Sequence, residues 1–98
     1  MISNNVHIRT SDSHPFFDIQ SGKRLNSAKN VYIGRHVWIA PYSAVYKGVH
    51  IGEGSITASH SLVTHDIPEN VIAAGLPAKI VKTGIRWSRE DVLYHDYP

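Results

Sequence analysis

The sequence has no cysteine, which excludes a disulfide framework, a thiolate metal site and a cysteine nucleophile. It has no apolar run approaching the roughly 18 residues of a membrane-spanning helix. Its first residues, MISNN, have neither the basic nor the apolar part of a signal peptide. These absences predict a cytoplasmic protein without a membrane span.

A strong excess of one charge is also missing. Ten Lys and Arg against eight Asp and Glu give a formal net charge of +2, too small to indicate a nucleic-acid partner. Basic residues gather toward the C-terminus, and the members of this group are Lys79, Lys82, Arg86 and Arg89. Charge pattern alone leaves open whether they form an anion site or a solvated basic face.

What the sequence does contain is a repeat of six residues. From Ile33 the chain divides into IGRHVW, IAPYSA, VYKGVH, IGEGSI, TASHSL and VTHDIP. The first position is β-branched in all six, as Ile, Val or, once, Thr57, and the fifth position is small or β-branched. Neither the alternation of a β-strand nor the spacing of an amphipathic helix produces these matches.

Such a pattern predicts a triangular parallel β-helix. Each hexapeptide contributes a short strand and a tight turn, three hexapeptides close one coil, and coils stack at about 4.8 Å. Residues eighteen apart should then lie above one another, with like residues in contact. The predicted vertical pairs are Ile33 with Ile51, Val45 with Val63, Gly34 with Gly52, and Val49 with Ile67.

The repeat is interrupted near the N-terminus. Ile2, Val6 and Ile8 fit a frame displaced by one residue from the later repeats, so a segment leaves the coil and returns. Proline, glycine and polar residues mark it as a protruding loop. We therefore expect one domain over residues 1–98, with a loop at 10–26, coils at 27–82 and a C-terminal segment at 83–98. In that last segment, Ser88 ahead of two acidic residues predicts a short helix over 88–95.

Four stretches together indicate a family: SDSHP, VWIA, IGEGSITASHSLVTHDIP and AAGLPAKIVK, which span most of residues 10–82. In this combination the chain resembles the hexapeptide-repeat acyltransferases, and most closely the branch that O-acetylates sugars and polysaccharides. The resemblance implies an all-β fold, a left-handed parallel β-helix with an inserted active-site loop. It also implies acetyl-CoA as co-substrate and a homotrimer with active sites between subunits. Related enzymes usually carry more coils before the loop, so this chain is expected to lack N-terminal coils.

The resemblance assigns roles to individual residues. His14 matches the catalytic histidine of the family, and Trp38 matches the tryptophan that lines the acyl-CoA thioester site. By the same resemblance, Ser59 and Thr64 match positions beside the pantetheine arm of the cofactor. Lys79 and Lys82 match the basic pair at the CoA phosphates. Two departures exist: family members commonly have alanine where Ser59 stands, and Asn-Pro-Ala where this chain has LPA at 76–78.

The chemistry expected at His14 is general base catalysis. Transfer of an acetyl group to a sugar hydroxyl needs a group that removes the hydroxyl proton, and an imidazole exchanges protons near neutral pH. A carboxylate should fix its tautomer, and the sequence leaves both Asp12 and Asp18 open for this role. No Ser-His pairing indicates an acyl-enzyme, so direct transfer is favoured over a covalent intermediate.

Two other functions are compatible with the sequence. A truncated solenoid would persist as a non-catalytic trimer that binds CoA without turning it over. The spacing of His60 and His65 is also similar to that of two zinc ligands in the β-helical γ-class carbonic anhydrases. A third ligand is needed for such a site, and the corresponding position, thirty-six residues before His60, holds Arg24. No metal is therefore expected.

Overall fold

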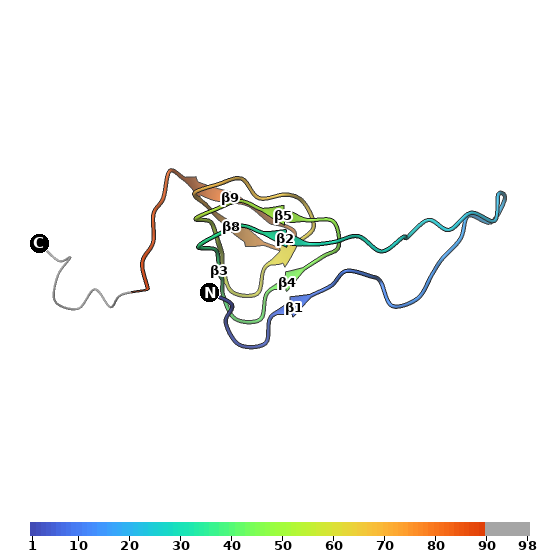
Figure 1. Cartoon of the computed structure of the whole chain (residues 1–98), viewed down its shortest axis with the longest axis horizontal. Helices are drawn as coiled ribbons and strands as arrows, with labels where there is room; N and C mark the ends of the chain where they lie inside the picture. The colour runs from blue at the N-terminus through green and yellow to red at the C-terminus, as the bar shows by residue number, and fades with distance from the viewer. Residues whose placement is uncertain (90–98) are drawn as a thin grey trace, which may run out of the picture.

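A computed structural model describes residues 1–89, and these form an all-strand solenoid with one long arm (Figure 1). In this part of the chain nine strands form three sheets, which are the faces of a triangular prism. The first sheet consists of β1 (His7–Ile8), β4 (Ala44–Val45) and β7 (Leu62–Val63), and the second of β2 (Tyr32–Ile33) and β5 (His50–Ile51). The third consists of β3 (Trp38–Ile39), β6 (Ile56–Thr57), β8 (Val71–Gly75) and β9 (Ala78–Thr83).

The six-residue pattern places two side chains of every repeat in the core. The first positions from Ile39 to Val63 are at most 2% exposed, while Ile33, in the first of these repeats, is half-buried. All six fifth positions are buried, and three of them are serines. Each serine hydroxyl has a backbone partner in this narrow interior: Ser43 donates to Ala58 O, Ser55 to Pro68 O, and Ser61 accepts from Gly75 N–H.

The predicted vertical register is confirmed in the regular coils and wrong in the last one. Ile33 pairs with Ile51 and Val45 with Val63, each eighteen residues apart. Ile67, however, bridges Ile51 rather than lying on Val49, because the last coil is two residues shorter. At the shortened corner the Asp66 carboxylate, rather than a backbone carbonyl, accepts the His50 N–H at 2.8 Å.

Thr57 is the one buried first position that is not aliphatic. Its side chain is fully buried, and its Oγ1 has no hydrogen-bond partner within residues 1–89. A buried hydroxyl without a partner is costly, so Thr57→Val should raise the free energy of unfolding by about 1–2 kcal/mol. Chemical denaturation measures the change, with Ser43→Ala as a control that should destabilise because its hydroxyl is bonded. A loss of stability in Thr57→Val would contradict this account of the core.

Residues 10–26 form a narrow arm that leaves the prism after β1 and returns before β2 (Figure 1). Across the arm, Asp18 N–H donates to Lys23 O at 2.8 Å and Leu25 N–H donates to Phe16 O at 2.9 Å. The arm explains the displaced frame, since His7 pairs with Ala44, thirty-seven residues away, instead of eighteen. This separation exceeds that of the regular coils by nineteen residues, which is three hexapeptides plus one residue.

The C-terminal part of the chain departs from the coil pattern. β8 and β9 pair antiparallel as a hairpin, so β9 extends the third sheet without adding another coil. Residues 84–89 are irregular. Residues 1–89 contain no helix, and therefore none that is long and apolar enough to cross a membrane. The helix expected over 88–95 is not begun at 88–89, and the rest of it lies outside the described residues.

Candidate active site

A row of side chains crosses the outer face of the third sheet. Trp38 pairs with Ile56, Ile56 with Ile72, and Ile72 with Lys82. Directly paired residues on neighbouring strands point to the same side of a sheet, so the four side chains share one face. All are half-buried or exposed, which identifies that face as the outer one. Three strand spacings separate Trp38 from Lys82 along this Trp38–Lys82 row, or roughly 14 Å.

A β-bulge brings Lys79 to the same face. Lys79 and Lys82 are three residues apart, and in a regular strand their side chains would point to opposite sides. The register shifts next to the Ile72–Lys82 pair, so that Lys79 lies opposite Ala74. Ile72 and Ala74 are two apart on β8 and face outward, and both lysines therefore do so too. Two exposed ammonium groups thus lie at the end of the row that is remote from the indole.

The two small polar residues expected at the cofactor lie elsewhere on the prism. Ser59 is exposed in the corner after β6, next to the third sheet. Thr64 follows β7 on the first sheet, where its Oγ1 lies 3.0 Å from His65 Nδ1. Within one chain, therefore, Ser59 adjoins the face of the Trp38–Lys82 row and Thr64 does not.

The aromatic end of the row carries a second tryptophan that sequence reasoning passed over. The Trp87 ring stacks on His36 at a centroid distance of 3.8 Å and lies 5.8 Å from the Trp38 ring. Trp87 Nε1–H donates to His36 O at 3.0 Å, and His36 Nε2 lies 2.8 Å from Trp87 O. Because a carbonyl only accepts, the His36 proton is on Nε2. The segment after β9 is thereby fixed beside Trp38.

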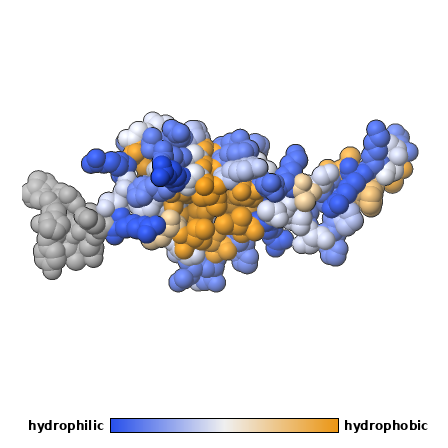
Figure 2. Space-filling model, in the orientation of Figure 1, coloured by the Kyte–Doolittle hydropathy of each residue, from blue (hydrophilic) through white to orange (hydrophobic). Residues whose placement is uncertain are grey.

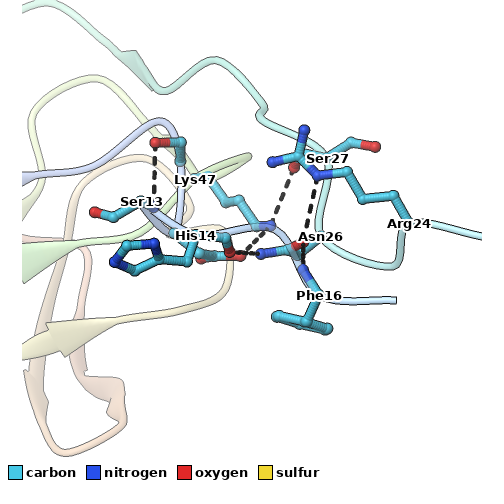
Figure 3. A network of polar contacts seen from close by, with 9 residues as sticks. Ser13, His14, Phe16, Arg24, Asn26, Ser27 and Lys47 are labelled. Atoms are coloured by element: carbon cyan, nitrogen blue, oxygen red, sulfur yellow. Dashed lines mark hydrogen bonds and ion pairs between the residues drawn. The ribbon is translucent and has the colours of Figure 1, made fainter. Parts of the chain in front are cut away.

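His14 lies near the base of the arm, and its ring is turned away from the polar contacts around it (Figure 3). Its carbonyl oxygen accepts a hydrogen bond from Asn26 Nδ2 at 2.7 Å. The side chain is exposed, and within residues 1–89 the imidazole forms no hydrogen bond. The tie to Asn26 is not visible in the sequence, because it joins residues twelve apart across an irregular loop.

Neither carboxylate that the sequence offered as an orienting group contacts this imidazole. Asp12 Oδ2 accepts from Lys47 Nζ at 2.6 Å, and that hydrogen bond lowers the pKa of the Asp12 carboxyl. Asp18 Oδ2 accepts from Ser21 N–H at 2.7 Å, which lowers the pKa of Asp18. Both carboxylates hold the loop, and their stabilising effect is present above the unfolded-state pKa and lost as pH falls through the lowered folded-state value.

The single chain keeps His14 and the Trp38–Lys82 row apart. The arm projects from one side of the prism, whereas β3 and β9 lie toward the opposite side (Figure 1). A separate open hollow of about 550 Å³ lies over β2 and β5. There His50 stacks on Tyr32 at 4.7 Å and its Nδ1 lies 3.6 Å from Asp66. That hollow belongs to a different face from the row and contains none of the residues expected at the site.

The histidines considered as metal ligands have other neighbours. His60 stacks on Tyr42 at a centroid distance of 5.0 Å, and His65 lies against Thr64. Within residues 1–89, no three His, Asp or Glu side chains come together in a group that could hold a metal ion.

Comparison with known proteins identifies the family. Residues 30–65 match the bacterial transferase hexapeptide family (six repeats). The chain is 47% identical over 91 residues to a polysialic acid O-acetyltransferase of Escherichia coli O1:K1 / APEC. The matched residues are 93% of this chain and 30% of that protein. The crystal structure of the polysialic acid O-acetyltransferase OatWY matches with a TM-score of 0.89 at 36% identity, covering 97% of this chain and 44% of that one.

A galactoside acetyltransferase in complex with coenzyme A matches with a TM-score of 0.68 at 28% identity, covering 84% of this chain and 44% of that one. The chain belongs to the hexapeptide-repeat transferases, and its fold is the left-handed parallel β-helix that the sequence resemblance implied. It spans less than half the length of these relatives.

Proposed function

We propose that this chain is the coenzyme-binding part of an acetyl-CoA-dependent O-acetyltransferase whose acceptor is a sugar or polysaccharide hydroxyl. The observation that carries the proposal is the Trp38–Lys82 row, with an indole at one end and the ammonium groups of Lys79 and Lys82 at the other. A ligand with an apolar acyl end and an anionic phosphate end matches this polarity. The relatives named as acetyltransferases, one of them bound to coenzyme A, support the same ligand.

In this proposal the row holds acetyl-CoA in an extended form. Trp38 packs against the acyl thioester, and the lysines pair with the phosphates by charge-assisted hydrogen bonds. Between them, Ile56 and Ile72 offer an apolar surface to the arm of the cofactor. Ser59 and Thr64 are small enough to let backbone groups approach the pantetheine arm of the cofactor. Ser59 would do so from the adjoining corner of the same chain, and Thr64 from the surface of another subunit. Holding both substrates on a rigid coil lowers the barrier by proximity.

His14 is the proposed general base. Its imidazole takes the proton of the acceptor hydroxyl while the hydroxyl oxygen attacks the thioester carbonyl carbon. The carbon–sulfur bond then breaks, and the imidazolium returns the proton to the departing thiolate, so that CoA leaves as the free thiol. Backbone N–H groups are the donors available to the oxyanion. The transfer is direct, and no residue of the chain becomes acetylated.

The proposed assembly is a homotrimer with its active sites between subunits, in the cytoplasm where acetyl-CoA is available. The separation of His14 from the row within one chain favours this arrangement, because the arm of one subunit would reach the row of the next. Figure 2 shows a broad apolar patch on the face of the prism that is turned toward the viewer. Exposed apolar residues on the prism include Ile2, Tyr42 and Val81, and such surface favours association.

The proposed acceptor is a polymer of acidic sugars, by analogy with the polysialic acid relatives. Release of CoA thiol from acetyl-CoA should depend on an added sialic acid polymer and be weaker with galactosides or maltose.

Sedimentation of the same sample should give a trimer. CoA binding without turnover on any acceptor would favour the non-catalytic module, and a stable monomer would contradict an intersubunit site. Stoichiometric zinc in the purified protein would favour the anhydrase alternative.

A further inference from the structure

Asn26 is the most deeply buried polar side chain of the arm. It is 2% exposed, whereas nearly all the residues around it from 10 to 30 are exposed. A buried amide must satisfy its donors and acceptor within the protein, and Asn26 does so with the chain around His14. Figure 3 shows its amide group placed between the carbonyl of His14 and the backbone of Phe16.

Two of the contacts of Asn26 bracket Pro15. Its Nδ2 donates to His14 O at 2.7 Å, and its Oδ1 accepts from Phe16 N–H at 2.8 Å and from Arg24 Nε at 3.4 Å. Pro15 itself has no N–H and a restricted φ. The Asn26 side chain therefore forms hydrogen bonds with the backbone before and after Pro15. These bonds hold the backbone on the C-terminal side of His14.

A second tie holds the other side of His14. Lys47, which belongs to the prism, donates from Nζ to Asp12 Oδ2 at 2.6 Å and to Ser27 O at 3.0 Å. Asp12 precedes His14 by two residues, and Ser27 directly follows Asn26. The backbone on both sides of His14 is thus tied to the coil through Lys47, directly at Asp12 and by way of Ser27 and Asn26. The ring points away from these contacts and forms no hydrogen bond within residues 1–89 (Figure 3).

We propose that Asn26 is a positioning residue that sets the direction in which the His14 imidazole projects from the arm. The inference rests on the proposed role of His14 as general base. Within residues 1–89, the hydrogen bonds of Asn26 go to the arm and not to the Trp38–Lys82 row, so we expect it to act on the placement of the base and not on coenzyme binding. Its loss should lower kcat and leave the affinity for acetyl-CoA unchanged.

The test is Asn26→Ala, assayed by CoA thiol release with a sialic acid polymer and by acetyl-CoA binding. A misplacement of about 1 Å at the reacting groups can cost roughly 100-fold in rate, so kcat should fall by about 10- to 100-fold. The dissociation constant for acetyl-CoA should stay within about twofold of that of the unaltered protein. Asn30→Ala is the matched control: within residues 1–89 the hydrogen bond of the Asn30 side chain is to Tyr32 OH at 3.5 Å and not to the chain around His14, so kcat should not change.

A second variant separates positioning from simple loss of structure. Asn26→Asp keeps an acceptor for Phe16 N–H but replaces the donor to His14 O with an oxygen that repels it. Hydrogen exchange of the Phe16 amide should stay slow in Asn26→Asp and become fast in Asn26→Ala, while kcat falls in both. If Asn26→Ala does not fold, Asn26→Asp decides alone: slow exchange of the Phe16 amide with a lowered kcat supports the positioning role, and an unchanged kcat overturns it.

The outcomes distinguish this inference from the proposed function. Full activity in Asn26→Asp or Asn26→Ala, together with an inactive His14→Ala, would overturn the positioning role alone. An equal loss of coenzyme affinity and kcat would also overturn it. Full activity in His14→Ala would overturn the function and the positioning role together.

Discussion

His14→Ala should reduce kcat/KM for acetyl transfer by about 10²- to 10⁴-fold, the range that a positioned general base contributes. Acetyl-CoA should still bind, because the Trp38–Lys82 row that holds it lies on the third sheet and keeps all of its residues in His14→Ala. The residual rate would come from alignment of the substrates and from backbone donors to the oxyanion. Thiol release and equilibrium binding of acetyl-CoA measure the two effects separately.

A further observation is expected if His14 is the base. Free imidazole added to His14→Ala should restore part of the rate. His7→Ala is the matched control, since His7 is exposed on β1 and belongs to no part of the proposed site. A His14→Ala protein with an undiminished rate would remove the base from the mechanism.

The repeat in the sequence predicts the prism because its first positions, Thr57 excepted, are large aliphatic residues, which are stable in a dry core and costly to expose to water. Ile39, Val45 and Val63 each recur at the first position, and all three are fully buried. The displaced frame around Ile8 likewise required an inserted segment, and the arm accounts for it. Local patterns of this kind are readable because each repeat has the same neighbours as the next.

The shortened last coil was not predicted, and its cause is specific. Ile67 fits the six-residue frame, yet it pairs with Ile51 because Asp66 replaces a backbone acceptor with its side chain. An aspartate in a turn can accept hydrogen bonds from many backbone N–H groups, so its position in the sequence does not predict that Asp66 bonds to His50 N–H. The frame alone therefore predicts the wrong vertical neighbour for Ile67.

The candidate site was readable in its residue types and hidden in its contacts. The face shared by Lys79 and Lys82 depends on a bulge, and a three-residue spacing in a strand gives no sign of one. The ties of Asn26 to His14 and of Trp87 to His36 join residues twelve and fifty-one positions apart. Such contacts are set by the path of irregular segments, which hydrophobic periodicity does not describe.

The largest change in stability should come from Ile39→Ala. Ile39 is 0% exposed, and its backbone lies between Ile2 and Thr57 in neighbouring coils. Coils at a fixed backbone spacing cannot close around the missing methyl groups, so the cavity persists. A loss of about 2–5 kcal/mol in the free energy of unfolding is expected, by the usual range for buried Ile→Ala changes.

Ile19→Ala is the matched control, because it is the same chemical change at a residue that is 99% exposed at the arm. Its effect should stay within about 0.5 kcal/mol. Both variants should be unfolded by denaturant at one protein concentration, since association would add to the apparent stability of each. Comparable losses in the two proteins would mean that the arm packs as tightly in the assembly as the coil does in the chain. The stiffness of the prism would then depend on neighbouring subunits, and the single-chain core would not be sufficient to hold the Trp38–Lys82 row in place.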